Sequence, residues 1–141
     1  SLWMAAREQP VVAAQRIQEQ ERSIVFGRYQ FNFEESTDCA LRPGQKPMKV
    51  DYEKLIFPLT VRLWQEGDFF MPLGMSGKKK LSDFFREQKL TLFEKEELPI
   101  LVNGNGEIIW LVGHRLDNRY KITEKTQKVF TLDYQETYER K

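Results

Sequence analysis

The sequence predicts an α+β fold: a small, mostly antiparallel β-sheet domain with one or two short helices packed on it, plus an N-terminal helical lead-in. Three observations support this class. Apolar and polar residues alternate along much of the chain after Ser23, which is the period of a half-buried strand. The segment Asn103-Gly104-Asn105-Gly106 separates two apolar runs and is typical of a hairpin turn. Helical spacing of apolar residues is confined to short stretches.

The first part of the chain differs from the rest. Pro10 suits the first turn of a helix, and the residues after it permit a helix whose apolar positions fade by Gln18. We therefore expect residues 1–22 to form a helical linker or the end of a preceding domain, with a frayed chain end as the alternative. Residues 23–135 would form the domain and residues 136–141 a polar tail. The chain is expected to be a piece of a longer protein.

The expected strands are short and are separated by turn residues such as Gly27-Arg28 and Pro43-Gly44. Apolar residues in them recur at every second position or form short runs. The expected strands are 24–26, 29–33, 39–41, 48–52, 56–64, 100–102, 107–112, 119–122 and 129–134.

Segment 56–64 gives the strongest strand signal, and one of its faces carries Arg62 next to Trp64. A guanidinium and an indole can both meet nucleic-acid bases or phosphates. The alternative is that Arg62 pairs with Asp68 or Glu66 while Trp64 is half-buried against the following loop. The sequence leaves both interpretations open.

A glycine- and proline-containing loop follows this strand. Gly67 is a turn residue, Pro72 restricts the backbone, Gly74 frees it, and Gly77 permits close backbone approach. These residues predict a loop of defined shape that ends in Lys78-Lys79-Lys80.

A short helix is expected at 81–88, with Leu81, Phe84 and Phe85 on its core face. Lysines placed before a helix N-terminus add positive charge where the helix dipole already favours anions. A second short helix opens with the capping box Thr91-Leu92-Phe93-Glu94. The loop and first helix together predict a docking element for the phosphate backbone of RNA.

The formal net charge is only +1, so any basic patch must come from local clustering. Residues 62–95 carry seven basic and five acidic side chains, and residues 107–128 carry five and three. The predicted RNA contacts therefore come from these two segments. They are Lys78, Lys79, Lys80, Arg86, Arg62, Arg115, Arg119 and Lys121. A solvated lysine loop and a protein-contact surface are the alternatives.

The sequence does not favour an active site. The sequence does not match the pattern of a nucleotide-binding P-loop. Gly77-Lys78 is followed by lysine where the pattern needs serine or threonine, and Pro72 stands where it needs the first glycine. A single Cys39 and a single His114 exclude His/Cys zinc sites, and His114 is weakly placed as a general base. We expect no catalytic residue, no metal and no cofactor here. The one cysteine and the lack of a long apolar run predict a cytoplasmic location without a membrane partner.

Several segments also carry a family resemblance, in the right order and spacing. They are Val50-Asp51-Tyr52-Glu53, Val61-Arg62-Leu63-Trp64, Gly67-Asp68, Pro72-Leu73-Gly74-Met75, Gly77-Lys78-Lys79-Lys80-Leu81-Ser82-Asp83-Phe84, Ile109-Trp110-Leu111-Val112-Gly113, Arg115 and Arg119-Tyr120-Lys121. From about Val50 to Leu132 the chain resembles the C-terminal domain of bacterial tRNA(Ile)-lysidine synthetase.

The resemblance implies a partner and a reaction. Enzymes of this family use ATP, with Mg expected, to adenylate the wobble cytidine of tRNA(Ile) and then attach lysine to it. That chemistry belongs to an N-terminal catalytic domain with a Ser-Gly-Gly-x-Asp-Ser loop, a motif missing from this chain. The C-terminal domain helps to hold the acceptor-stem side of the tRNA and is similar to a tRNA synthetase β-chain domain. This chain departs from the family at His114, and it has Phe69 and Phe70 where some members carry basic residues.

Two hypotheses follow. In the first, the domain binds tRNA(Ile) for a lysidine-forming ligase. Its phosphate contacts would be Lys78, Lys79, Lys80 and Arg86, while Arg62, Arg115 and Arg119 lie beside them or brace the loop. In the second, the domain is a scaffold that packs on its own catalytic half or forms a homodimer, without touching RNA.

Overall fold

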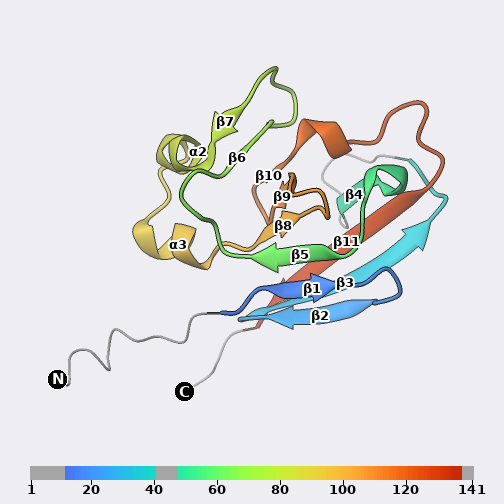
Figure 1. Cartoon of the computed structure of the whole chain (residues 1–141), viewed down its shortest axis with the longest axis horizontal. Helices are drawn as coiled ribbons and strands as arrows, with labels where there is room; N and C mark the ends of the chain where they lie inside the picture. Colours follow the sequence, from blue (N-terminus) through green and yellow to red (C-terminus); the bar gives the residue numbers. More distant parts are fainter. Residues whose placement is uncertain (1–11, 41–47, 138–141) are drawn as a thin grey trace.

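A computed structural model of the chain describes residues 12–40 and 48–137, and these fold into two antiparallel sheets, a small hairpin and short helices (Figure 1). The predicted α+β class, mostly antiparallel with two short α-helices, is confirmed. The larger sheet has the strand order β1-β5-β8-β9-β10. Its strands are β1 Gln15–Ile17, β5 Leu59–Arg62, β8 Ile100–Val102, β9 Ile108–Leu111 and β10 Arg115–Leu116.

The second sheet has the strand order β2-β3-β11-β4. Its strands are β2 Ser23–Phe26, β3 Tyr29–Ser36, β4 Met48–Asp51 and β11 Val129–Glu136. The long pairing of β3 with β11 runs from Tyr29 opposite Glu136 to Ser36 opposite Val129. This pairing joins the beginning of the domain to its end, and β11 extends into what the sequence predicted as tail.

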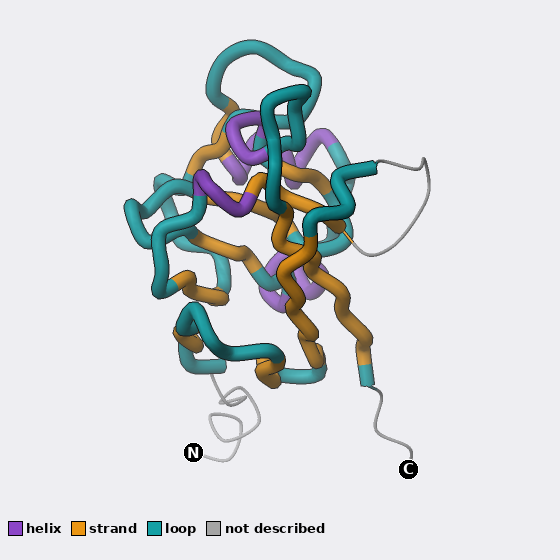
Figure 2. Tube along the Cα trace, turned by 90° about the vertical axis from the view of Figure 1, so that its right-hand side faces the viewer, coloured by secondary structure: helices purple, strands orange, loops and turns teal. Residues whose placement is uncertain are grey.

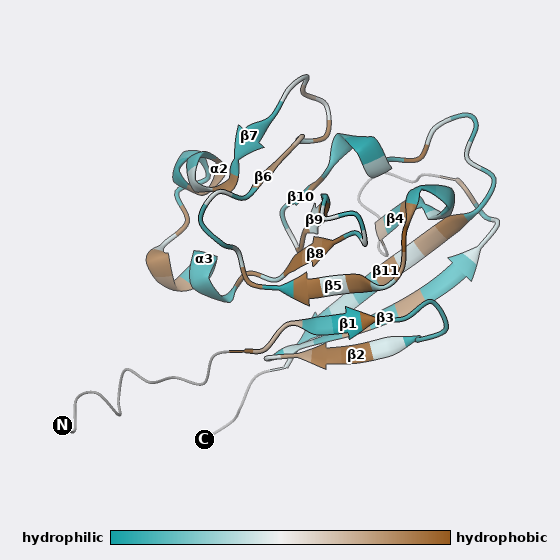
Figure 3. Cartoon of the chain, in the orientation of Figure 1, coloured by the Kyte–Doolittle hydropathy of each residue, from teal (hydrophilic) through white to brown (hydrophobic). Residues whose placement is uncertain are grey.

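The two sheets pack face to face around one apolar cluster, to which Phe31 and Phe130 contribute from one sheet and Leu59 and Ile109 from the other. A second cluster lies on the opposite face of the larger sheet, where Ile100 is buried with side chains of a helix. Strands β8 and β9 are therefore buried on both faces, which explains their unbroken apolar sequences. Figure 3 shows the brown, hydrophobic colour of β8 between the layers.

The helices are α2 Leu81–Glu87, α3 Leu92–Glu97 and two single 3-10 turns, η1 Tyr52–Lys54 and η2 Asn118–Tyr120. Helix α2 buries Leu81, Phe84 and Phe85, the core face that its spacing predicted. Helix α3 carries the predicted capping box in full, with Thr91 and Glu94 bonding each other's backbone N–H. No helix within 12–40 and 48–137 is long and apolar enough to span a membrane.

Three local expectations are wrong. Residues 39 and 40, expected to begin a strand over 39–41, lie in no strand, and residue 41 is outside the described part. Residues 12–22 do not form a helical lead-in: Gln15–Ile17 is strand β1, which pairs with β5, and Ile17 is buried in the core between the sheets. Residues 1–11 lie outside the described part. The expected strand at 119–122 is instead η2, because Asp117 caps a helical turn there by accepting the backbone N–H of Arg119. The domain boundaries themselves stay a prediction.

The third sheet is a two-residue hairpin, β6 Phe69–Phe70 with β7 Lys79–Lys80. The loop between these strands stands at the top of the molecule in both Figure 1 and Figure 2, and α2 begins directly after β7. The predicted glycine-rich segment is therefore the loop at the tip of a hairpin, and helix α2 follows the second strand of that hairpin directly.

Candidate nucleic-acid interface

The register of the β6–β7 hairpin divides its side chains between two faces. Phe70 lies opposite Lys79, and Phe69 lies opposite Lys80. Phe70 is fully buried and stacks edge-on against Phe84 of α2. Phe69 is 43% exposed. Because directly paired residues of an antiparallel hairpin share a face, Lys80 lies with Phe69 on the outer face.

The three lysines consequently have different surroundings. Lys79 faces inward and forms an ion pair with Glu87 of α2, with its ammonium 2.7 Å from the carboxylate. Lys78 is exposed, and its ammonium lies 4.8 Å from the centre of the Phe69 ring. Lys80 is exposed and forms no ion pair with any described residue. We name the outer face of Phe69, Lys78 and Lys80 the hairpin face.

The loop between β6 and β7 is fixed to the chain around β10. Pro72 forms a β-bridge with Asp117, and the backbone N–H of Leu73 donates to the carbonyl of Leu116 at 2.9 Å. The Asp117 carboxylate, which is fully buried, accepts the backbone N–H of Met71 at 2.9 Å. These bonds give the loop a defined position beside a segment more than 40 residues away in sequence.

Gly74 and Gly77 give the rest of the loop its backbone direction, and the close backbone approach expected at Gly77 is wrong, because nothing lies near it. Their φ angles are +85° and +94°, in the left-handed region that side-chain-bearing residues rarely adopt. Neither has another atom near the place where a Cβ would stand. Their role is therefore the direction of the backbone, with no requirement for close packing.

Arg62 is engaged with Asp68, which is the alternative that the sequence left open. The guanidinium donates to both carboxylate oxygens, at 2.9 and 3.1 Å, and also to the carbonyl of Leu63. Trp64 is half-buried and meets the Phe85 ring edge-on. Arg62 thus holds the entry to the hairpin in place. It has little freedom to bind a phosphate.

Arg119 is also a bracing residue. It donates from Nε and Nη2 to the Asp117 carboxylate at 3.0 and 2.9 Å, and its Nη1 lies 3.0 Å from Glu107. The hydrogen bond to Asp117 raises the pKa of Arg119 above its ordinary value. Arg119 neutralises a buried carboxylate, so it is unsuited to be a mobile phosphate ligand.

The remaining predicted cations are more available. Arg115 lies 5.8 Å over the Phe84 ring and donates to the carbonyl of Leu73 at 3.4 Å, which places it beside the loop. Arg86 is exposed and, among the described residues, forms an ion pair only with Asp83, one turn earlier on α2. Lys121 is exposed and follows η2, with no ion pair to a described residue. Whether these side chains touch RNA stays a prediction.

Sequence reasoning missed two residues that organise this surface. Asp117 is the buried junction of the loop, η2 and Arg119. Phe69 is exposed between Lys78 and Lys80 on the hairpin face. Among the described residues, no group of three or more His, Cys, Asp or Glu side chains lies close enough together to hold a metal ion.

Comparison with known proteins identifies the family. Residues 59–134 match the family model of the TilS substrate C-terminal domain. The chain belongs to this family. The resemblance to a lysidine-synthetase C-terminal domain is thereby confirmed, and the matched residues include the hairpin face, its loop and Asp117.

Relatives of this TilS C-terminal domain are longer proteins. A tRNA(Ile)-lysidine synthase of Parabacteroides distasonis is 44% identical over 97 residues, which are 69% of this chain and 22% of the relative. The chain thus spans about a fifth of the length of that relative.

Two solved structures share the fold. The crystal structure of a TilS C-terminal domain superimposes with a TM-score of 0.70 at 24% identity, covering 94% of this chain and 96% of the other. An N-terminal fragment of the phenylalanyl-tRNA synthetase β-subunit from Pyrococcus horikoshii gives a TM-score of 0.52 at 20% identity. It covers 62% of this chain and 27% of that one. The expected likeness to a synthetase β-chain domain is confirmed at the level of fold.

Proposed function

We propose that this TilS C-terminal domain binds tRNA(Ile), on the acceptor-stem side, as part of a longer tRNA(Ile)-lysidine synthase. The observation that carries the proposal is the hairpin face. It presents two exposed lysines on a two-stranded support, next to a loop that is hydrogen-bonded to the body of the domain at several points.

The chemistry of the hairpin face suits the RNA backbone more than the bases. Lysine ammonium groups bind phosphates as point charges and carry no sequence information. In an RNA helix the deep, narrow major groove hides the bases, so a protein recognises duplex RNA through its shape, phosphates and ribose hydroxyls. Phe69 between the lysines adds an apolar surface that can lie against ribose. The domain would therefore hold a stem without reading its sequence.

The catalytic step would take place elsewhere in the longer protein. The family's reaction needs ATP, with Mg expected, to activate the wobble cytidine before lysine is attached. The adenylating loop of the family, Ser-Gly-Gly-x-Asp-Ser, does not occur in this sequence. ATP and its metal would thus bind to the catalytic domain, and this chain would supply affinity and orientation for the tRNA.

Binding of the chain to tRNA(Ile) at two salt concentrations tests the proposal. The double variant Lys78→Ala/Lys80→Ala removes both cations of the hairpin face. Each phosphate contact contributes about 0.9 to the slope of log affinity against log salt, so the slope should fall by about 1 to 2. Fluorescence anisotropy of a labelled tRNA measures both quantities.

Two control variants make the result specific. Lys54→Ala/Lys125→Ala removes two exposed lysines outside the hairpin and should leave affinity and slope unchanged. Lys79→Ala removes the lysine that is paired with Glu87 and should weaken binding less than either Lys78→Ala or Lys80→Ala. Wild-type binding by the double variant would overturn the assignment of the hairpin face.

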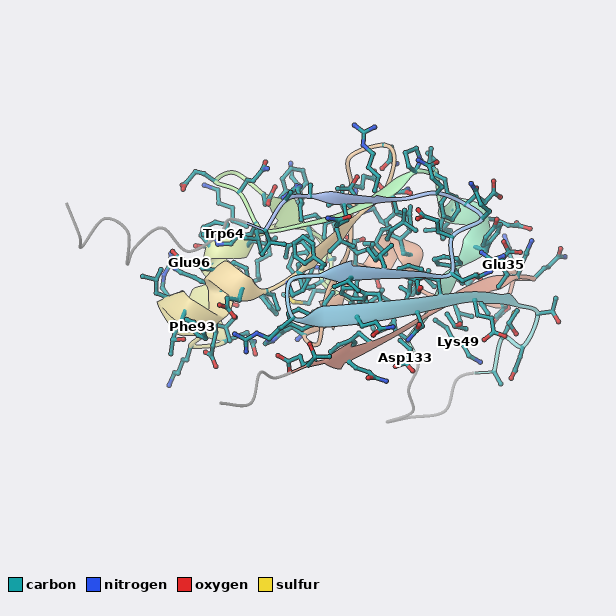
Figure 4. All side chains as sticks on the ribbon, turned by 90° about the horizontal axis from the view of Figure 1, so that it is seen from below. Glu35, Lys49, Trp64, Phe93, Glu96 and Asp133 are labelled. Carbon is teal, nitrogen blue, oxygen red and sulfur yellow. The ribbon has the colours of Figure 1, made fainter. Side chains whose placement is uncertain are left out.

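Helix α3 favours the second candidate function, an interaction domain. Leu92 and Phe93 are 63% and 60% exposed, an unusual pair of apolar side chains for a free surface. In Figure 4, Phe93 lies at the outer edge of α3. If this pair packs on the catalytic half or on a second copy, Leu92→Ser/Phe93→Ser should weaken that association while tRNA binding by the chain alone is unchanged. Sedimentation velocity of the chain, with and without the catalytic half, measures it.

A further inference from the structure

A groove of about 520 Å³ lies on the side of β9 and β10 that faces β4 and β11. Its apolar walls include Trp110, Leu116 and Leu132, and the turn after β9 closes one side with Gly113, His114 and Arg115. Trp110 is 3% exposed and forms the floor of the groove. The rings of Tyr134 and His114 are more exposed, so they are the ones that a flat ligand could cover.

The rim of the groove is predominantly basic. Arg115, Lys121 and Lys49 line it, and Asp133 is the single acidic residue among the described lining residues. Figure 4 labels Lys49 and Asp133 near β11. The ammonium of Lys49 is already held by the carbonyls of Asp38 and Ala40 at 2.8 and 2.9 Å, whereas Lys121 has no such partner among the described residues. A ligand with a negative charge next to an apolar, planar part would complement this groove.

Gly113 leaves room for the Tyr134 hydroxyl at the groove. A Cβ at Gly113 would stand 2.9 Å from the Tyr134 hydroxyl, and the φ of Gly113 is +81°. Any other residue would thus push the tyrosine ring aside and be strained itself. Tyr134 in turn meets Trp110 at 5.8 Å between ring centres, in an edge-on arrangement. A side chain at position 113 would therefore displace the Tyr134 ring of this aromatic wall.

The groove is continuous with the proposed RNA surface. Arg115 and Leu73 both line it, and the guanidinium of Arg115 donates to the carbonyl of Leu73 in the loop that supports the hairpin face. A nucleic-acid backbone that crosses the loop would reach the groove at Arg115.

We infer that this groove binds an unpaired nucleotide of the RNA, with its base over Tyr134 and His114 and its phosphate at Arg115 and Lys121. The inference rests on the proposed function. A base inside a duplex has both faces stacked, so only a single-stranded nucleotide can turn its base into such a groove. Aromatic walls with a few basic groups are the usual surroundings of such a base, and the volume lies in the range of small-ligand sites.

Three RNA hairpins with one common stem test the inference: a blunt one, and two that carry a four-nucleotide single strand at the 3′ or the 5′ end. The chain should bind one tailed hairpin about tenfold more tightly than the blunt one. His114→Ala and Lys121→Ala should each remove most of this advantage, and the matched surface variant Lys125→Ala should keep it. In nitrogen-15 NMR spectra, the tailed hairpin that binds more tightly should shift the indole signal of Trp110 and the amide signals of Gly113 and His114. The indole signal of Trp64 should not shift.

The outcomes separate this inference from the proposed function. One outcome is that the chain binds all three hairpins with equal affinity, with that affinity depending on Lys78 and Lys80 and no shift in the NMR signals of the groove residues. This result would overturn the inference and leave the proposed function standing. If no hairpin and no tRNA binds, both fall. Groove signals that shift with protein concentration in the absence of RNA would assign the groove to a second copy of the chain, and would also overturn the inference.

Discussion

The buried carboxylate of Asp117 is held by the guanidinium of Arg119 through two hydrogen bonds of 3.0 and 2.9 Å. The same carboxylate accepts the backbone N–H of Met71, and Arg119 also reaches Glu107. One ion pair therefore joins the β8–β9 hairpin, the turn η2 and the loop that supports the hairpin face. Both residues lie within the segment that matches the family model, and they support the surface on which RNA is proposed to lie.

Arg119→Ala should destabilise the domain strongly. Removal of the arginine leaves a fully buried carboxylate without its charge partner, which costs about 3 kcal/mol or more. Urea unfolding at pH 7 measures the loss. Arg86→Ala is the matched control, because the exposed pair of Arg86 with Asp83 is worth at most about 0.5 kcal/mol. Similar stability of the two variants would contradict the bracing role.

Arg62→Ala should separate bracing from RNA contact. The two-fold hydrogen bond to Asp68 is mostly buried, so its loss should cost about 2 kcal/mol of stability. The salt slope of tRNA binding should stay that of the wild type, since Arg62 releases no counterions from RNA. A slope lower by about one unit would instead make Arg62 a phosphate ligand.

Gly104→Ala should be poorly tolerated for a steric reason. A Cβ at this position would stand 2.2 Å from the carbonyl oxygen of Ile56, to which the N–H of Gly104 donates at 2.7 Å. Backbone must move to relieve the clash, and we expect a loss of about 3 kcal/mol. Gly77→Ala meets no atom and has only an unfavourable φ, so about 1 kcal/mol is expected there. Thermal unfolding of both variants measures the difference.

His114 should titrate below the ordinary histidine pKa of about 6.5. Burial lowers its pKa, against a smaller opposite effect of Glu94. The folded state therefore binds its proton less readily than the unfolded chain does. The stability that this contributes is present above pH 6.5 and is lost as the pH falls from there through the folded-state pKa.

His114 is the only histidine of the chain, so one imidazole proton signal reports its titration directly. An NMR midpoint at or above 6.5 would contradict the expected shift. The His114→Asn variant should lose less stability than the wild type between pH 7 and pH 5, as measured by urea unfolding.

The local elements could be predicted where one short signal decided the structure. The hairpin turn at 103–106, the capping box of Thr91 and Glu94, and the buried face of α2 all follow from spacing within a few residues. Gln15–Ile17 could not be predicted in this way. Its sequence permits a helix, and it becomes a strand because Ile17 is buried in the core between the sheets while its backbone pairs with β5.

The predicted interface shows the same division. The family, a shaped loop with glycines and the lysine run could be read from the sequence. The β6–β7 hairpin and the left-handed φ angles of Gly74 and Gly77 came only from the structure. The role of each cation could not, because it depends on which carboxylate lies within reach after folding. Arg62, Lys79 and Arg119 meet Asp68, Glu87 and Asp117, whereas Lys78 and Lys80 form no ion pair with a described residue.

By itself, the sequence determined the class of fold, the shaped loop and the residue types that can bind phosphate. These are properties of local spacing and of side-chain chemistry. The tertiary structure alone decided which lysines face outward and which arginines are held in ion pairs with nearby carboxylates. It also alone brought Gly113, Arg115 and Tyr134 together around one groove. The reason is physical: ion pairing, burial and close packing are set by residues distant in sequence that only the folded chain brings together.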